Sequence, residues 1–525
     1  MAVYCGKIPP VDDPSEGSTV LPKALVVSAK VDGQTVSDRG TAERVSNNPT
    51  ITLEFSREVK ADEASLSSIQ FEGGLLTVKL HPTDNSKLVF TPESYLADGG
   101  RYKFCIVAGD CFGVNLKSDY TFWITTRYVI DDQTDKFPRI TDDELFEMVQ
   151  KGAFDYFWDY GHPDSGLARE RLGSGDTVTS GGSGFGIMAI PVGIERGWIT
   201  REEGAQRMLK IARFLQNSER FHGAWPHWLN GKTGKAIAFS SKDDGADLVE
   251  TSFLMEGLLA VKHYFTGTDA TETEIRTIIK DLWEGVEWTW FQRGGQNVLY
   301  WHWSPNYDWD MNMKITSWNE ALIVYVLAAS SPTYPITKEV YDKGWKGTNS
   351  YNYKDPLFFV HYSYMGLDPR HLKDAYADHW AQTCLHVRTN YEHCANSDKG
   401  YGYSAECWGL TASDYYNGYT ASSPSHDTGT VAPTAALASF PYMPEEAMAA
   451  MKYFYYKLGN RLWGKYGFYD AFALRENWFA SSYIAIDEGP IVVMMENYRT
   501  GLLWDTFMKD TDVQAGLTKL GFTWN

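Results

Sequence analysis

Residues 141–158 read TDDELFEMVQKGAFDYFW, and here the pattern of the chain changes from short strands to helices. Thr141 and Glu144 have the spacing of a capping box, in which each side chain hydrogen-bonds the backbone N–H of the other residue. Apolar residues then recur on one helix face: Leu145, Phe146, Val149, Phe154, Phe157 and Trp158. The stretch predicts the first long helix of a helical domain.

The same helical signals recur downstream, along residues 138–525. Thr200 and Glu203 form a second capping box, and we expect their helix to reach Asn217. Further helices are predicted near 247–265, 272–291, 317–330, 371–386, 433–440, 444–459 and 490–508. Glycine- and aromatic-rich loops separate them, which favours an all-α toroid of paired helices, an (α/α)6 barrel. A non-toroidal helical array is the alternative.

The chain before residue 131 reads differently. Runs such as ALVVSAKV (24–31) and YTFWITT (120–126) are rich in β-branched and aromatic residues, and turn signals such as VDGQ (31–34) and ADGG (97–100) separate them. This pattern predicts an all-β sandwich of immunoglobulin type over 20–130. The protein is therefore expected to be multidomain, with residues 1–19 as a tether, 20–130 as the sandwich and 138–525 as the helical domain.

Composition and charge exclude several partners and cofactors. The net charge is −19 and no basic stretch is present, which excludes nucleic acid and disfavours uronate polymers. No run of 18 apolar residues occurs, so no membrane span is expected. The six cysteines lack CxxC spacing, and the glycine-rich stretch 175–189 lacks the Lys-Ser/Thr of a phosphate loop. We expect no metal, no cofactor and a monomer.

Carboxyl groups and aromatic rings gather in the loops between the predicted helices. In ADLVETSFLMEGL (246–258), Glu250 lies in line with Leu254 and Leu258 on an apolar face, where desolvation raises the pKa of a carboxyl. Cleaving a glycosidic bond needs one protonated carboxyl and one ionised carboxyl. We predict Glu250 as the general acid. For the base we rank Asp487 first, then Asp159 and then Asp414.

The same loops supply candidate sugar-binding residues, because Trp and Tyr offer flat faces for stacking and short polar groups bind hydroxyls. The histidines lack HExxH spacing, which favours sugar contacts or core positions over metal ligation. Three alternatives stay open: a structural ion network for 169–171, a helix cap for 487–488, and a core hydrogen bond for Glu320. The predicted binding residues are His162, Arg169, Glu170, Trp225, His227, Trp228, Trp303, Trp318, Asn319, Glu320, Trp408 and Glu488.

Eight motifs occur in a fixed order: SGLARER, TSGGSGFGIMA, HGAWPHWLNGKTGK, DLVETSFLMEGLL, WNEAL, WGLTASD, GTVAPTAALASFPYMPEE and IDEGPIVVMMENYRTGLLW. Together they resemble the glycoamylase-like catalytic domain of glycoside hydrolase family 144, the bacterial β-1,2-glucanases, over roughly 140–525. The particular resemblance is to an exo-acting, sophorose-releasing member from a Bacteroidetes-type bacterium. Residues 20–127 resemble a bacterial Ig-like domain.

The resemblance implies an (α/α)6 toroid, inversion at the anomeric carbon, and linear β-1,2-glucan or its oligosaccharides as substrate. Release of sophorose from chain ends is the expected mode, and endo cleavage is the alternative. A polysaccharide lyase and a non-catalytic glycan-binding protein are the rival classes. For location, we expect the periplasm or an outer-membrane anchor through a lipid on Cys5, with a stray cysteine as the alternative.

Overall fold

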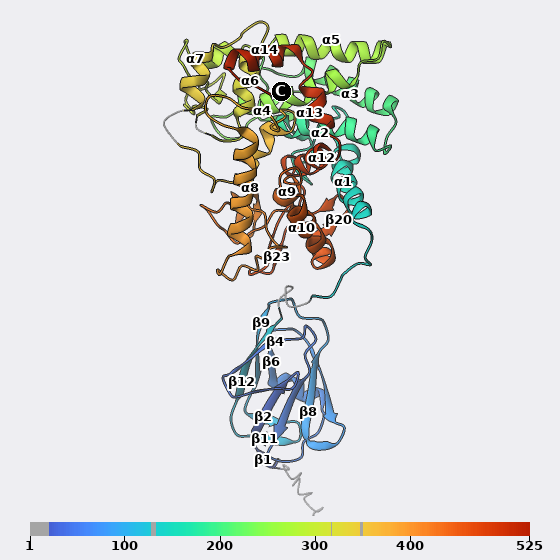
Figure 1. Ribbon diagram of the computed structural model, residues 1–525. Coiled ribbons are helices and arrows are strands. Elements are labelled where there is room, and N and C mark those ends of the chain that lie inside the picture. The colour runs from blue at the N-terminus through green and yellow to red at the C-terminus, as the bar shows by residue number, and fades with distance from the viewer. Residues whose placement is uncertain (1–19, 128–132, 317, 347–349, 525) are drawn as a thin grey trace, which may run out of the picture. The chain divides into compact units, whose positions relative to one another are not determined.

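The computed structural model describes residues 20–127, 133–316, 318–346 and 350–524 (Figure 1). The chain divides into two compact units, residues 1–132 and 133–525. The first unit is rich in strands and the second in helices, which confirms a multidomain chain with this order of classes. The predicted tether, and Cys5 within it, lie outside the described residues.

The first unit contains two larger sheets and one small sheet. The sheets have the strand orders β3-β2-β5-β8-β7, β4-β12-β9-β6 and β1-β11-β10. The strands are β1 (Lys23–Ala24), β2 (Val26–Val31), β3 (Gln34–Val36), β4 (Thr41–Val45), β5 (Ile51–Phe55), β6 (Ile69–Phe71), β7 (Leu76–His81), β8 (Asp84–Pro92), β9 (Arg101–Ile106), β10 (Gly109–Cys111), β11 (Val114–Leu116) and β12 (Tyr120–Thr126).

Alternating side chains from these sheets fill one apolar core. In β5, Ile51, Leu53 and Phe55 are buried while the residues between them are partly exposed. Phe104 and Phe122 stack across β9 and β12 with ring centroids 4.9 Å apart. The period of two in the sequence thus becomes an inner and an outer face of each sheet.

The second unit is built from helices that begin with the predicted caps. Both capping boxes, at Thr141 and at Thr200, are present. The helices are α1 (Asp142–Asp159), α2 (Ser180–Glu195), α3 (Arg201–Asn217), α4 (Leu248–Tyr264), α5 (Ala270–Glu284), α6 (Leu322–Ser330), α7 (Lys338–Val340), α8 (His379–Ala395), α9 (Pro433–Leu437), α10 (Pro444–Tyr456), α11 (Gly459–Leu462), α12 (Ala485–Arg499), α13 (Leu502–Phe507) and α14 (Thr511–Leu520).

These helices differ in how they are buried. Helices α2, α4, α6 and α12 are buried over most of their circumference, whereas α3, α5 and α14 are buried on one face only. Helix α2 packs against α4 and α12, α3 packs against α5, and α6 packs against α14. An inner group of apolar helices is therefore covered by amphipathic ones.

Some predicted helix boundaries are wrong, for local reasons. Helix α8 begins at His379 because the Asp378 side chain accepts a hydrogen bond from the Ala381 N–H, not near 371. Helix α12 begins at Ala485 and contains Pro490, which the sequence prediction placed at its start. Gly501, with a φ of 74°, then separates α12 from α13.

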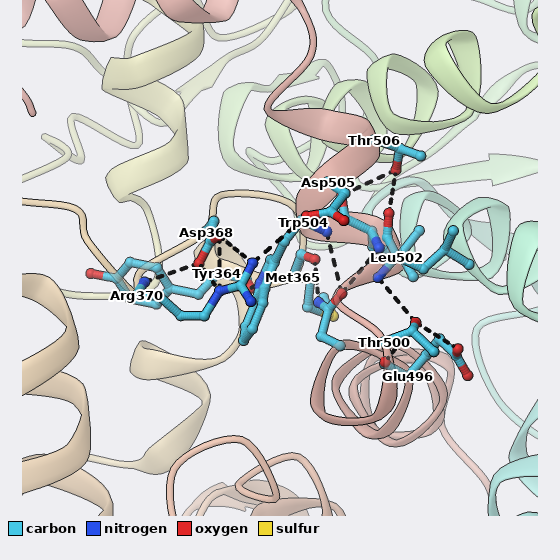
Figure 2. Close-up of polar contacts among 12 residues, drawn as sticks. Tyr364, Met365, Asp368, Arg370, Glu496, Thr500, Leu502, Trp504, Asp505 and Thr506 are labelled. Atoms are coloured by element: carbon cyan, nitrogen blue, oxygen red, sulfur yellow. Dashed lines mark hydrogen bonds and ion pairs between the residues drawn. The ribbon is translucent and has the colours of Figure 1, made fainter. Parts of the chain in front are cut away.

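The carboxyl-terminal end of α12 is fixed by polar contacts (Figure 2). Thr500 accepts a hydrogen bond from the Leu502 N–H at 3.2 Å and donates one to Glu496 at 2.8 Å. The Trp504 indole N–H donates to the Tyr364 carbonyl at 2.7 Å, and Arg370 lies over the Trp504 ring. The Trp504 contacts hold α13 against the segment 364–370, and Asn497 of α12 donates to the Met365 carbonyl at 2.8 Å.

Short strands join the loops that lead into the inner helices. Strand β13 (Thr177–Thr179) precedes α2 and pairs with β14 (Trp228–Asn230), which pairs with β15 (Ala236–Ile237). Strand β16 (Ala246–Asp247) precedes α4 and pairs with β17 (His302–Trp303). Further pairs are β18 (Ala412–Tyr415) with β19 (Gly418–Ala421), β20 (Trp463–Gly464) with β21 (Gly467–Phe468), and β22 (Phe472–Ala473) with β23 (Trp478–Phe479).

Among the described residues, no helix combines the length and the apolar character that crossing a membrane requires.

Candidate active site

A pocket of about 350 Å³ lies where the loops before α2, α4 and α12 meet. Carboxyl groups, one guanidinium and several aromatic rings share its wall, which is the usual make-up of a small-ligand site. The lining residues are Glu170, Arg171, Thr179, His227, Trp228, Phe239, Glu250, Tyr419, Ile484 and Ile486. Four of the residues singled out from the sequence, Glu170, His227, Trp228 and Glu250, are thus brought together.

Glu250 lies in the first turn of α4, three residues after Asp247, whose side chain caps the helix. Its Oε2 accepts a hydrogen bond from the Gly181 N–H at 2.8 Å, and the residue is only 9% exposed. Burial raises the pKa of Glu250, and the charge of Asp247 adds to this effect, although His227 opposes it. Glu250 is therefore a carboxyl in the pocket wall that favours its protonated form.

Two His–Asp contacts lie behind Glu250. His227 Nδ1 is 3.1 Å from Asp247 Oδ2, and His302 Nε2 is 3.3 Å from Asp243 and 3.5 Å from Asp247. Burial lowers the pKa of both imidazoles, but the carboxylates outweigh it and raise the pKa of His227 to about 9 and of His302 to about 10. Both rings are therefore cationic at neutral pH.

This charge state bears on metal binding. Ligand atoms of His227, Asp243 and Asp247 lie within 4.8 Å of one another, a spacing that suits a metal ion. A protonated imidazole has no free lone pair for a metal, however, and two imidazolium ions already balance the two carboxylates. An ion at this place would have to displace the proton of His227, because the same atoms form the His–Asp contact behind Glu250.

A second group of carboxyls surrounds the start of α12. Asp487 and Asp470 are each 3% exposed and are hydrogen-bonded to each other. Burial, together with the neighbouring charges, raises the pKa of Asp487 well above its ordinary value and that of Asp470 to about 7. Two carboxyls so close together titrate as a pair, because each one disfavours the ionisation of the other. The charge of Asp487 acts on Tyr419, which lines the pocket.

Arg171 ties the pocket wall to Asp414. Its guanidinium donates to both oxygens of Glu170 at 3.0 Å and to Asp414 at 3.0 and 3.2 Å. Ser482 donates to Asp414 at 2.6 Å. The ion network that was one alternative for 169–171 is thus present, but its partners are Glu170, Arg171 and Asp414. Arg169 instead donates to the carbonyls of Gly175 and Tyr160.

Several predicted site residues lie elsewhere. Trp225 and Trp408 are fully buried, and their indole N–H groups donate to Ser218 and to the Glu446 carbonyl. A ring without exposed area offers no face to a sugar, so these two tryptophans belong to the core. His162 is buried as well and contacts Asp176 at 3.1 Å. Asp159 is exposed at the end of α1 and is absent from the pocket wall.

The loop before α6 brings a third carboxyl near Glu250. Burial raises the pKa of Glu320 to about 7, and the charges of Glu250 and Asp247 contribute. Asn319 instead accepts a hydrogen bond from the Ala321 N–H, and Trp318 packs against Trp345 and Tyr351. Glu320 therefore interacts electrostatically with Glu250. Trp318 and Asn319 instead make contacts within and around the loop.

The cap interpretation of 487–488 is excluded. The residue at the N-cap of α12 is Ile484, and no side chain caps this helix. Glu488 is 2% exposed, its Oε2 has no hydrogen-bond partner, and burial raises its pKa well above the ordinary value. Asp487 and Glu488 are thus buried acids rather than surface caps.

Sequence reasoning missed three aromatic residues of the site. Phe239 and Tyr419 are each 48% exposed and line the pocket, and Phe239 stacks on His227 at 4.1 Å. Tyr362 has a buried hydroxyl without a hydrogen-bond partner. Burial raises the pKa of this hydroxyl, and the charges of Asp487, Glu320 and Glu250 raise it further. Their signal was weak, because none of the three has an acid as its direct neighbour in the sequence.

Comparisons with known proteins identify relatives of this chain. Residues 312–511 match the family model described as Glycoamylase, putative glucoamylase. The exo beta-1,2-glucooligosaccharide sophorohydrolase (non-reducing end) of Parabacteroides distasonis is 45% identical over 419 residues, which are 73% of this chain. The chain spans 58% of the length of this curated relative.

Two solved structures are also similar. A putative glucoamylase from Bacteroides uniformis is 57% identical with a TM-score of 0.73, and the match covers 74% of this chain and 99% of that one. An endo-beta-1,2-glucanase from Chitinophaga pinensis, solved with sophorotriose and glucose, is 50% identical with a TM-score of 0.71, covering 73% and 99%. The chain therefore belongs to the glycoamylase-like β-1,2-glucanases of glycoside hydrolase family 144, as its eight motifs predicted.

Proposed function

We propose that this protein is an inverting glycoside hydrolase that cleaves β-1,2-glucan or its oligosaccharides and releases sophorose from chain ends. The observation that carries the proposal is Glu250, a buried and hydrogen-bonded carboxyl in the wall of a pocket with aromatic sides. Its raised pKa keeps a proton ready for the glycosidic oxygen. The curated relative that is named as a sophorohydrolase supports this substrate.

Asp487 is the proposed base. In its ionised form Asp487 can take a proton from water, and its charge acts on Tyr419 in the pocket wall. Asp414 suits this role less, because the Arg171 guanidinium already neutralises its charge. Inversion then requires the water to attack from the side opposite Glu250.

Trp228, His227 and Phe239 are the proposed walls for the sugar rings. Phe239 stacks on His227 and meets the Trp228 ring edge-on at 4.9 Å, so these rings form one aromatic surface in the pocket. Glu170 and Arg171 line the same pocket with charged groups that bind hydroxyls. A neutral glucan fits this mixture of flat and polar surfaces.

A time course of products from long β-1,2-glucan tests the proposal. Sophorose as the sole early product, while the polymer stays long, is the expected result. Oligosaccharides of many lengths at early times would instead show endo cleavage, the mode in the name of the Chitinophaga pinensis relative. Products that absorb near 235 nm from a uronate polymer, with none from β-1,2-glucan, contradict the proposal and favour the lyase. Absence of product from either polymer favours the glycan-binding protein.

For the finer architecture we infer an (α/α)6 toroid over 138–525 and an Ig-like sandwich over 20–130. Inner apolar helices covered by amphipathic ones support the first, and two sheets around one core support the second. An experimental structure tests the toroid. Six helix pairs around one axis are the expected result, and a single layer of helices contradicts it.

We further propose a monomer in the periplasm, or one anchored to the outer membrane through a lipid on Cys5. Detergent-phase partitioning of the protein expressed in a bacterial host tests the anchor. Partitioning that Cys5→Ala abolishes is expected, and unchanged partitioning contradicts it.

A further inference from the structure

An aromatic surface outside the pocket is exposed to solvent. Trp290 is 40% exposed and Tyr307 45%, and both come from the stretch between α5 and α6. Trp303 and Trp309 pack beside Trp290, with ring centroids 6.1 and 6.3 Å away. Grouped exposed rings of this size are uncommon on a surface that contacts only water, so a ligand for them is expected.

The Trp290 ring is held in a fixed orientation. His222 stacks on it with ring centroids 3.7 Å apart and an angle of 12° between the planes. Glu287 fixes His222 in turn, because its carboxylate contacts His222 Nδ1 at 2.9 Å and its N–H donates to the His222 carbonyl at 3.0 Å. Since His222 covers one face of Trp290, the exposed area lies on the rest of the ring, as in a preformed platform.

The backbone around this surface is strained. His222, Arg293, Asp308 and Asn312 all have φ between 48° and 52°, a left-handed conformation that non-glycine residues rarely adopt. Arg293 donates to Asn312 at 2.6 Å and so links two of them. Strained positions that cluster in one surface are typical of binding sites, because the strain persists only where a particular shape is needed.

The surface lies beside the strand pair that leads to the proposed active site. In the β16–β17 pair, Trp303 lies opposite Ala246, and the neighbouring His302 lies opposite Asp247, the residue that caps the helix of Glu250. The Trp303 ring meets His222 edge-on at 4.9 Å. A path of contacts thus leads from Asp247 through His302 and Trp303 to Trp290.

We infer that this surface, formed by His222, Trp290, Trp303, Tyr307 and Trp309, binds glucose units of the β-1,2-glucan chain beyond those in the pocket. The inference rests on the proposed function. The apolar face of a glucose ring stacks on an indole plane. An extended neutral polymer is longer than the pocket, and this surface lies on the strand that pairs with the segment just before the helix of Glu250.

The test compares substrates of different length. Trp290→Ala should raise KM for long β-1,2-glucan about tenfold, equivalent to about 1.4 kcal/mol, with kcat unchanged. The kcat/KM for the shortest oligosaccharide that the wild type cleaves should stay the same, because that substrate does not reach Trp290. Trp290→Phe should restore part of the loss, since it keeps a flat ring. Tyr307→Ala, at a more exposed position, repeats the test if Trp290→Ala folds poorly.

Tyr334→Ala is the matched control. Tyr334 is an aromatic residue of similar exposure, 39%. It follows the carboxyl-terminal end of α6, whereas Glu320, the residue near Glu250, precedes the amino-terminal end of that helix. Equal effects of Trp290→Ala on short and long substrates, or none on either, overturn the inference. Failure of the proposed function looks different, because the wild type then releases no product from β-1,2-glucan of any length.

Discussion

At the scale of single residues, burial decides which carboxyls can carry a proton. Glu250, Glu320, Asp470 and Asp487 all have a raised pKa, and burial is the largest cause for each. An exposed carboxyl such as Asp159 lacks this environment. The site therefore concentrates carboxyls with a raised pKa in a chain whose net charge is strongly negative.

Replacing Glu250 tests the role of the acid. Glu250→Gln keeps the shape of the side chain but removes the proton donor, so kcat should fall by about 10²- to 10⁴-fold. Glu256→Gln is the control in the same helix: Glu256 is fully buried, and its Oε1 accepts from the Gly366 and Leu367 N–H groups away from the pocket. Its kcat should be unchanged. Steady-state rates decide, and similar rates for the two variants contradict the assignment.

Glu320 should make stability depend on pH. Its pKa is raised to about 7 in the folded protein, so the folded state holds a proton that the unfolded chain releases above about pH 4.5. The stabilisation present below that pH is lost as the pH rises through 7, by up to about 3 kcal/mol.

Glu320→Gln should remove the part of the fall in folding stability between pH 5 and pH 8 that comes from this carboxyl. Urea denaturation at pH 5 and pH 8 measures it, with the exposed Glu392→Gln as control. A variant that loses as much stability as the wild type between the two pH values argues against a titrating Glu320.

At the scale of elements, glycines let α2 and α4 touch through their backbones. A Cβ on Gly184 would lie 2.2 Å from the Phe253 carbonyl oxygen, and one on Gly257 would lie 2.2 Å from the Gly184 oxygen. A Cβ on Gly181 would instead meet the Glu250 carboxylate at 2.5 Å. The close approach of the two helices thus lets the Gly181 N–H donate its hydrogen bond to the Glu250 carboxylate.

Two substitutions in α2 should therefore affect different properties, one the stability of the protein and the other its activity. Gly184→Ala pushes two backbones apart and should lower the free energy of unfolding by about 1–3 kcal/mol. Gly181→Ala displaces only the end of a side chain, so it should keep the fold and lower kcat instead. Thermal unfolding and steady-state rates separate the two, and loss of activity without loss of stability in Gly184→Ala contradicts this account.

At the scale of the whole molecule, each of the two units has its own core. The strand-rich unit buries one apolar cluster of its own, and the helical unit buries α2, α4, α6 and α12. Since a domain with its own core folds alone, each unit should be stable by itself.

Separate expression of residues 20–127 and 133–525 tests this expectation. Each piece should unfold in one cooperative transition, followed by circular dichroism, at a temperature close to a transition of the full chain. A piece without a cooperative transition would show that its core is incomplete.

The sequence by itself determined the element types and the family, and it singled out Glu250, which lies in the pocket wall. Capping boxes at Thr141 and Thr200 act within four residues, so local spacing was enough to predict them. The eight motifs were enough for the family. Glu250 stood out because a carboxyl on an apolar helix face conflicts with its surroundings.

Only the tertiary structure decided which residues share the pocket. Trp225 and Trp228 are three residues apart in one loop, yet the first is buried in the core and the second lines the pocket. Asp414 and Asp470 reach Arg171 and Asp487 from distant loops. Burial and long-range contacts depend on how helices pack, and no local spacing contains that information, whereas caps and helix faces are set within a few residues.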